Sequence, residues 1–77
     1  MQTQEVLKKI IEGINPFDDF DLDTDLLGEG ILDSLSLMLF IEQAEKQLNI
    51  FIPEERVSLD TFYSLNTILK LIKELKS

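Results

Sequence analysis

Apolar residues recur at helical spacing in three segments of this chain, and this periodicity restricts the fold more than any other feature. The segments cover about residues 3 to 14, about residues 34 to 49, and the residues that follow Ser64. In each segment the apolar positions lie three or four residues apart, as they do along one face of an α-helix. We find no strand pattern in the sequence. The periodicity predicts an all-α fold, a small four-helix bundle of three main helices plus a short third helix over Asp60–Tyr63.

Capping residues and helix breakers set the expected helix boundaries. Thr3 is a good N-cap for the first helix, and Asn15-Pro16 ends it. Asp33 is a good N-cap for the second helix, and Ser64 is one for the last. The residues expected to face the core are Val6, Leu7, Ile10, Ile11 and Ile14 in the first helix, Leu37, Ile41, Ala44 and Leu48 in the second with Phe40 at its edge, and Leu65, Ile68, Leu69, Ile72 and Leu75 in the last.

The first connection, residues 15–33, is long and rich in apolar residues, so we expect it to be ordered. Long ordered loops in compact domains are usually functional. Gly28 and Gly30 permit the backbone turns that lead into the second helix. A second apolar stretch, Ile50–Pro53, is expected to pack as a loop or a single turn. The residues of the first connection that are expected to reach the core are Phe17, Phe20, Leu22, Leu26, Leu27, Ile31 and Leu32.

Length and composition limit the chemistry that this chain can perform. With 77 residues it is expected to be one domain, residues 1–77, near the lower size that a single hydrophobic core can stabilise. It contains neither cysteine nor histidine. The usual zinc sites and any Ser-His or Cys-His nucleophile pair are therefore excluded. We expect a protein that is not an enzyme.

The net charge of −8, from 15 acidic and 7 basic residues, indicates which partners suit the chain. An acidic field disfavours nucleic acid and anionic membranes, and it favours partners with basic docking surfaces. No apolar run reaches the roughly 18 residues of a membrane helix, and the N-terminus lacks the apolar region of a signal peptide. A chain without cysteine is compatible with a reducing compartment. We expect a cytoplasmic protein that neither binds nucleic acid nor inserts into a membrane.

A run of aspartates in the first connection raises the question of calcium binding. An EF-hand loop needs Gly at its sixth position and Glu at its twelfth. Leu26 and Leu32 stand at these positions in one register, and Thr24 and Gly30 in the other, so both registers fail. A solvated acidic loop without a metal site is the favoured interpretation. The aspartates are Asp18, Asp19, Asp21, Asp23 and Asp25.

Leu35 and Leu39 form an apolar pair on the otherwise polar face of the second helix, with Met38 at the border of that face. Two interpretations stay open at this point. Either the first connection folds over the pair, or the pair stays exposed and docks a partner. Exposed apolar residues are normal when they are scattered, so their presence alone does not decide between the two.

The segment from Gly30 to Leu35, with Asp33 and Ser34 in its middle, resembles the signature of the acyl carrier and peptidyl carrier proteins. In that family an Asp-Ser-Leu triplet opens the second helix. The stretch Ile50–Pro53 is similar to the apolar turn with proline that follows this helix in the family. The resemblance extends over nearly the whole chain and suggests a free-standing carrier of this type.

The resemblance implies a function and a set of partners. A phosphopantetheinyl transferase would move 4′-phosphopantetheine from coenzyme A to the Ser34 hydroxyl, and Asp33 would help to dock that transferase and to guide the arm. An adenylating or acyltransferase loading enzyme would then charge the thiol of the arm as a thioester. A downstream synthase or transferase would receive the cargo. The start of a helix suits the phosphodiester because the helix dipole favours negative charge there.

The chain departs from fatty-acid carriers just after the triplet, where these carriers have more acidic residues. Ser36 and Leu39 stand at those places here, whereas Glu42 and Glu45 are retained. A carrier from a polyketide or nonribosomal peptide pathway is therefore the leading interpretation, acting as a monomer on separate enzymes. A D-alanyl or fatty-acid carrier is the alternative, and a small acidic adaptor without a prosthetic group represents another class. The expected partner face consists of Leu35, Met38, Leu39 and Glu42.

Overall fold

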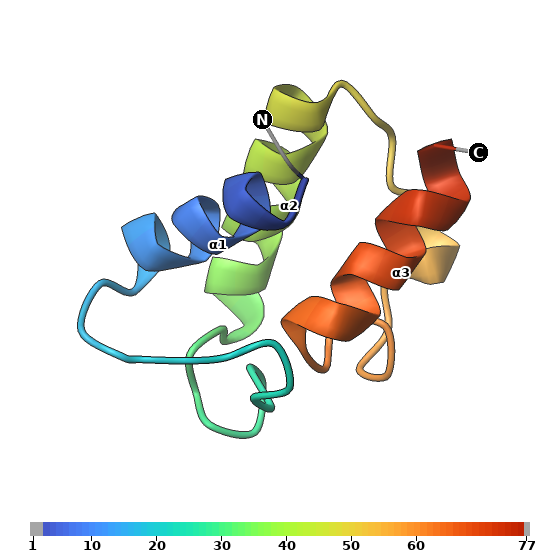
Figure 1. Ribbon diagram of the computed structural model, residues 1–77. Helices are drawn as coiled ribbons and strands as arrows, with labels where there is room; N and C mark the ends of the chain where they lie inside the picture. Colours follow the sequence, from blue (N-terminus) through green and yellow to red (C-terminus); the bar gives the residue numbers. More distant parts are fainter. Residues whose placement is uncertain (1–2, 77) are drawn as a thin grey trace.

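The computed structural model describes residues 3–76, which form three α-helices and one short 3-10 helix (Figure 1). The α-helices are α1 (Thr3–Ile14), α2 (Ser34–Leu48) and α3 (Leu65–Lys76), and the 3-10 helix η1 covers Glu54–Arg56. No strand occurs within this range. The all-α fold with three main helices, predicted from the sequence, is confirmed.

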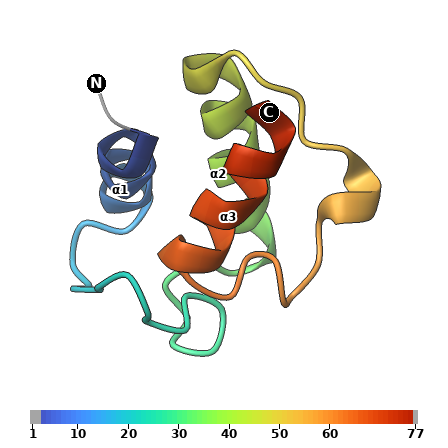
Figure 2. The ribbon, with the colours of Figure 1, turned by 45° about the vertical axis from the view of Figure 1, so that its right-hand side comes forward.

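The three α-helices enclose the core from different directions. α1 packs against both α2 and α3. α2 and α3 both run from the end of the molecule that holds the first connection toward the opposite end, and α1 crosses them (Figures 1 and 2). The start of α2 therefore lies at the same end of the molecule as the first connection.

The core combines residues of all three α-helices with residues of the first connection and of the second connection, which is the segment 49–64 between α2 and α3. Phe40 of α2 and Phe62 of the second connection are fully buried, and their rings meet edge to face with centroids 6.4 Å apart. The other buried apolar residues are Val6, Leu7, Ile10 and Ile11 of α1, Ala44 of α2, Leu65, Ile68, Leu71 and Ile72 of α3, and Leu26, Ile31, Leu32 and Ile52 of the connections.

The sequence pattern placed the centre of the buried face of α2 at the wrong residues. Phe40 and Ala44 are fully buried, whereas Leu37, Ile41 and Leu48 are only partly buried at the margin of the core. Packing of the Phe62 ring onto Phe40 explains the shift, because the second connection covers the side of α2 where Phe40 stands. Such a contact between distant segments is not encoded in the helical periodicity of α2.

A similar shift affects α3 and the connections. In α3, Leu71 is buried, whereas Leu69 and Leu75 are only packed against the margin of the core. Phe17 was expected to reach the core, but 94% of its surface is exposed. Asn15 explains this, since its side-chain amide binds the carboxylate of Asp18 and bridges the intervening residues into a turn that points outward.

The short helix lies at a different place from the one predicted. Residues Asp60–Tyr63 form a turn, whereas η1 occupies Glu54–Arg56 directly after Pro53, whose φ of −62° suits the start of a helix. The carbonyl of Tyr63 accepts a hydrogen bond from the N–H of Leu26, at 2.8 Å. That carbonyl is therefore used to tie the two connections together.

The predicted helix boundaries agree with the structure to within a residue. α2 ends at Leu48, and Asn49 closes it in the left-handed conformation with φ 54°. Ser64 caps α3 as predicted, since its hydroxyl accepts the N–H of Thr67. Thr3 is itself the first residue of α1, and the position before it lies outside the described residues.

Within residues 3–76, none of the helices has the length and apolar character that crossing a membrane requires.

Candidate functional site

Ser34 is the first residue of α2, and its side chain is exposed. Its hydroxyl has no hydrogen-bond partner among residues 3–76. The other serines of this range differ: Ser36 is hydrogen-bonded and partly buried, Ser58 is bonded within its own turn, and Ser64 is buried beneath α3. Ser34 therefore combines exposure with a hydroxyl that no structural role occupies.

Asp33 holds the start of α2 in place. It has an extended backbone, and its carboxylate Oδ1 accepts the N–H of Ser36 at 2.8 Å, as the sequence predicts for an N-cap. This backbone hydrogen bond, with a further one from the Ser36 side chain, lowers the pKa of Asp33. The carboxylate is thus ionised at neutral pH and is engaged by its own helix.

The chain that leads into Ser34 is fixed by backbone and side-chain hydrogen bonds. The carboxylate of Asp25 accepts the N–H of Gly28 at 2.8 Å, and a Cβ on Gly28 would lie 2.1 Å from that carboxylate. Gly30 has a φ of +75°, a conformation that side chains rarely adopt. The N–H of Leu32 then binds the carbonyl of Leu26, and both side chains are buried. Ser34 consequently follows a rigid turn instead of a flexible loop.

The residues around Ser34 fit a phosphodiester. The hydroxyl is accessible to a second protein, and it stands at the positive end of the α2 dipole, where a negative group is stabilised. The chain contains no histidine, and no side chain of residues 3–76 is bonded to this hydroxyl. The site presents a hydroxyl for another protein's chemistry.

The apolar residues predicted on the outer face of α2 are exposed. Leu35 and Met38 expose 70% and 68% of their surface, and Leu39 exposes 46%. Glu42 is exposed one turn further along. The first connection does not fold over these residues, so the interpretation that it covers the pair is wrong, and docking of a partner stays a prediction. Large apolar side chains gathered on one surface mark a site of interaction more often than scattered ones do.

A groove beside this surface was not foreseen from the sequence. It lies between α2 and the segment Phe51–Val57, has a volume of about 600 Å³, and includes Met38 and Glu42 in its lining. The carboxylate of Glu45 holds the segment by accepting the N–H of Ile52 at 2.8 Å, which buries Ile52 and leaves Phe51 73% exposed. The signal in the sequence was the apolar stretch Ile50–Pro53, which was interpreted as a packed loop or single turn similar to the turn of the carrier family, without a groove beside it.

The aspartates of the first connection serve local turns. Asp21 accepts the N–H of Asp23 at 2.9 Å and the hydroxyl of Thr24 at 3.0 Å, and the Asp23 hydrogen bond is the main reason why the pKa of Asp21 is lowered. Within residues 3–76, no three acidic or other ligating side chains form a group that could hold a metal ion.

The fold and the Ser34 end of α2 together define a small carrier protein, a helical bundle that presents a serine at the start of its capped second helix. Comparison with known families then identifies the family to which this carrier belongs. The chain belongs to the family described as phosphopantetheine attachment site, whose match extends over residues 5–75.

Curated relatives match over nearly the full length of both chains. The D-alanyl carrier protein of Lactococcus lactis subsp. lactis (strain IL1403) is 33% identical over 75 residues, which is 95% of each chain. The D-alanyl carrier protein of Lactococcus lactis subsp. cremoris (strain MG1363) is 34% identical over 73 residues, which is 92% of each chain. The resemblance to carrier proteins seen in the sequence is confirmed.

Membership in this family establishes the general role of the protein. It is a carrier with covalently attached 4′-phosphopantetheine, and it works with a transferase that attaches the arm and with enzymes that load and unload it. The names of the matching relatives agree with the D-alanyl carrier, which was the alternative interpretation of the sequence. The polyketide or nonribosomal peptide pathway, which was the leading interpretation, finds no comparable support among them.

Proposed function

We propose that this protein is a non-enzymatic D-alanyl carrier whose arm is attached to Ser34. The exposed, unbonded hydroxyl of Ser34 at the start of α2 is the observation that carries the assignment. Ser36, Ser58 and Ser64 each have a hydroxyl that is bonded within the fold, so modification there would break existing contacts. Ser34 can be modified without a structural cost.

The division of labour between this chain and its partners follows from the site. Once attached, the arm supplies a thiol that holds a carboxylic acid as a thioester. Ser34 offers its hydroxyl, and Asp33 keeps the first turn of α2 formed so that the hydroxyl stays at the dipole's positive end. We expect the transferase to supply the base, since the carboxylate of Asp33, next to Ser34 in the chain, is engaged by Ser36. Asp33 also contributes a negative charge to the surface on which the transferase docks.

The D-alanyl cargo is supported by the relatives and is compatible with the surface. Both relatives align over nearly their whole length, and both are named for D-alanine. The outer face of α2 exposes apolar side chains where fatty-acid carriers have acidic ones, which favours a different set of partner enzymes. The proposed docking face for the loading enzyme consists of Leu35, Met38, Leu39 and Glu42. We further propose that the protein is a single carrier domain that acts as a cytoplasmic monomer on separate enzymes.

The attachment site is tested by intact-protein mass after incubation with coenzyme A and a broad-specificity phosphopantetheinyl transferase. We expect one phosphopantetheinyl group on the wild type and on Ser58→Ala, and none on Ser34→Ala. Ser58→Ala is the matched control because Ser58 is the other exposed serine of the described range. A Ser34→Ala protein that still gains the group would place the arm elsewhere. A folded wild type that gains nothing would favour the acidic adaptor instead.

The cargo is tested on the modified protein with ATP and a D-alanine-activating adenylating enzyme. We expect the mass of one alanyl group to appear with D-alanine and to disappear on treatment with hydroxylamine, which cleaves thioesters. L-alanine in the same reaction is the control. Loading by a malonyl transferase, with none by the adenylating enzyme, would restore the polyketide interpretation.

A further inference from the structure

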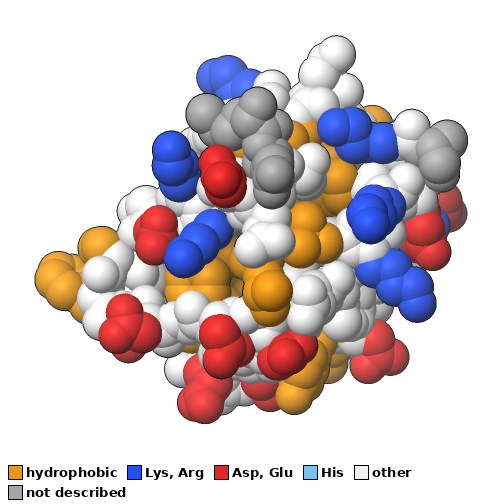
Figure 3. Space-filling model, in the orientation of Figure 1, with side chains coloured by type: hydrophobic (Ala, Val, Ile, Leu, Met, Phe, Trp, Pro, Cys, Tyr) orange, Lys and Arg blue, Asp and Glu red, His pale blue; other side chains and the backbone are white. Residues whose placement is uncertain are grey.

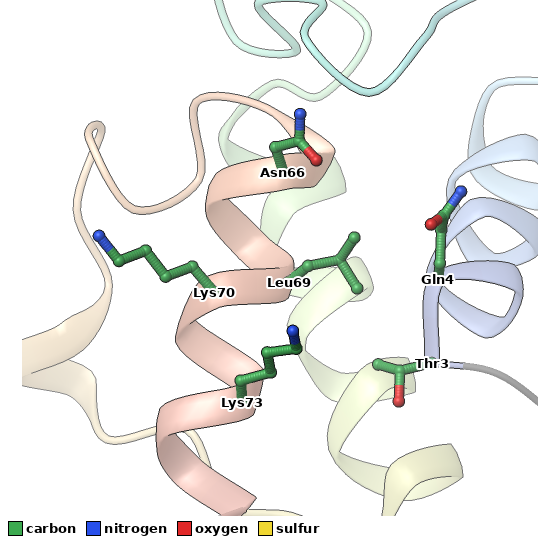
Figure 4. A pocket seen from close by; sticks show the side chains of 6 residues that line it. All are labelled: Thr3, Gln4, Asn66, Leu69, Lys70 and Lys73. Atoms are coloured by element: carbon green, nitrogen blue, oxygen red, sulfur yellow. The ribbon is translucent and has the colours of Figure 1, made fainter.

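A cleft runs between α1 and α3, on a side of the protein that the proposed carrier function does not use. One part, of about 430 Å³, is lined by Gln4 of α1 and by Asn66, Leu69, Lys70 and Lys73 of α3. The adjoining part, of about 330 Å³, shares Leu69 and Lys73 with the first. Leu69 and Lys73 project from α3 toward α1, whereas Lys70 points away and stands on the outer rim (Figure 4).

The charge of this side contrasts with that of the rest of the molecule. Residues 15–64 carry 12 acidic and 2 basic side chains, whereas α3 carries three lysines and a single glutamate. The three lysines, Lys70, Lys73 and Lys76, all line the cleft. On the face seen in Figure 3, acidic side chains gather along the lower edge, and basic side chains lie in the upper part on both sides of exposed apolar surface. The cleft is thus a basic site on an acidic protein.

The floor and rim of the cleft indicate the shape of its occupant. Leu69 and the buried Ile72 give an apolar floor between two helices, which is the kind of groove that an amphipathic helix fills. Lys70, Lys73 and Lys76 are three residues apart, so their Cα atoms rise by about 4.5 Å from one to the next along α3. Acidic residues at three- or four-residue spacing on a second helix can match this rise.

We propose that this cleft binds an acidic amphipathic helical segment of a partner protein, with the acidic side chains of that segment against Lys73 and Lys76. A membrane surface fits less well, because the apolar lining lies within a cleft between α1 and α3 that a flat surface cannot enter. A second copy of this chain fits less well too, since its acidic residues 18–25 form no helix and Asp23 is already bonded to its own α3. There, Asn66 bonds the carbonyl of Leu22 and the carboxylate of Asp23.

The position of the lysines leaves the proposed carrier site free. Lys73 and Lys76 lie in the last turns of α3, toward the end of the molecule opposite the start of α2, where Ser34 stands (Figures 1 and 2). The end of the cleft nearest the first connection is less basic, because Asp21 stands beside Lys8 in the lining of the adjoining hollow and offsets its charge. A partner in the cleft would therefore hold the carrier while its arm stays available, in the manner of a scaffold.

The test is a titration of the ¹⁵N-labelled protein with a synthetic helical peptide of about 15 residues that carries a leucine stripe flanked by glutamates. We expect chemical-shift changes centred on Leu69, Ile72 and Lys73, and a weakening at high salt. Lys73→Gln/Lys76→Gln should raise the Kd about fivefold to tenfold. Lys46→Gln, an exposed lysine of α2 away from the cleft, should leave the Kd unchanged.

Several results would overturn the proposal. They are a peptide that fails to bind, shifts centred on α2, an equal Kd for the Lys73→Gln/Lys76→Gln and Lys46→Gln variants, or binding to phosphatidylglycerol vesicles without binding to the peptide. The unmodified protein suffices for the titration, so its outcome is independent of the arm. Conversely, the lysine variants should accept phosphopantetheine from the transferase at the wild-type rate.

Discussion

α2 carries apolar residues on two faces, the core stripe and an otherwise polar face, and the structure buries only the first. On one face Phe40 and Ala44 are fully buried. On the other, Leu35 exposes 70% of its surface, Met38 68% and Leu39 46%. A helix of 15 residues thus supports the core with one face and keeps the other bare. Apolar character alone therefore does not separate residues that stabilise a fold from residues that are available to partners.

The outer face of α2, with Leu35, Met38 and Leu39, stays exposed because of the path that the first connection takes. Its backbone binds the start of α3 and the turn before it, with Leu22 bonded to Asn66 and Leu26 to Tyr63. These bonds direct the connection away from the outer face of α2. They also bury Leu26 against the core and bring the chain to Ser34 through a rigid turn. The same bonds therefore leave the apolar surface open and position the serine beside it.

The largest effect should come from Phe40→Ala on the buried face. Removing this ring leaves a cavity against Phe62, and we expect the free energy of unfolding to fall by about 3–5 kcal/mol. Chemical denaturation followed by circular dichroism measures it. Met38→Ala, on the outer face of the same helix, should change the free energy by no more than about 0.5 kcal/mol. Equal losses in both variants would show that the outer face also supports the fold.

A smaller effect, on function alone, is expected from Leu39→Glu on the outer face. A charge within the proposed docking face should lower kcat/KM for loading by the cognate adenylating enzyme about fivefold or more, with little change in stability. Gln47→Glu adds the same charge at an exposed position nearer the end of α2 and should load normally. A Leu39→Glu protein that loads at the wild-type rate would contradict the assignment of this face to docking.

Local signals in the sequence predicted the three main helices and the start of α2 at Ser34 well. Asp33 and Ser64 cap their helices through hydrogen bonds within three residues, so their roles depend on neighbours that the sequence shows directly. Gly30 adopts the positive φ that glycine favours. The triplet at Ser34 was recognisable for the same reason, since its context is the start of a helix after a turn with glycine.

Contacts between distant segments were not predictable in the same way. Phe40 became the centre of the buried face because Phe62, 22 positions away in the sequence, packs on it. A turn stands at Asp60–Tyr63 in place of the expected helix, and the Tyr63 carbonyl ties this turn to Leu26 of the first connection. The cleft between α1 and α3 likewise arises from how two helices at opposite ends of the chain meet. The periodicity of apolar residues describes one helix at a time and carries no information on contacts between distant segments.

The smallest expected effect concerns Asp33, on which both faces of α2 depend for their first turn. Hydrogen bonding to Ser36 lowers the pKa of Asp33 in the folded protein, so its stabilising contribution is fully present above the pKa of the unfolded chain. This contribution is lost as the pH falls through the lower, folded pKa. Melting curves should show the loss below about pH 4, the ordinary range of aspartate.

Two variants of Asp33 separate the cap from its charge. Asp33→Ala removes the cap and should lower the Tm by a few degrees at neutral pH, less than Phe40→Ala does. Asp33→Asn keeps a good capping side chain without a titrating group, so its Tm at neutral pH should stay close to that of the wild type, and its Tm should fall less steeply on acidification. The carboxylate of Asp21, whose pKa is also lowered, still titrates in both variants and accounts for part of the remaining slope. If Asp33→Asn and the wild type lose stability equally with acid, the charge of Asp33 contributes nothing to the start of α2, and the cap acts through its geometry alone.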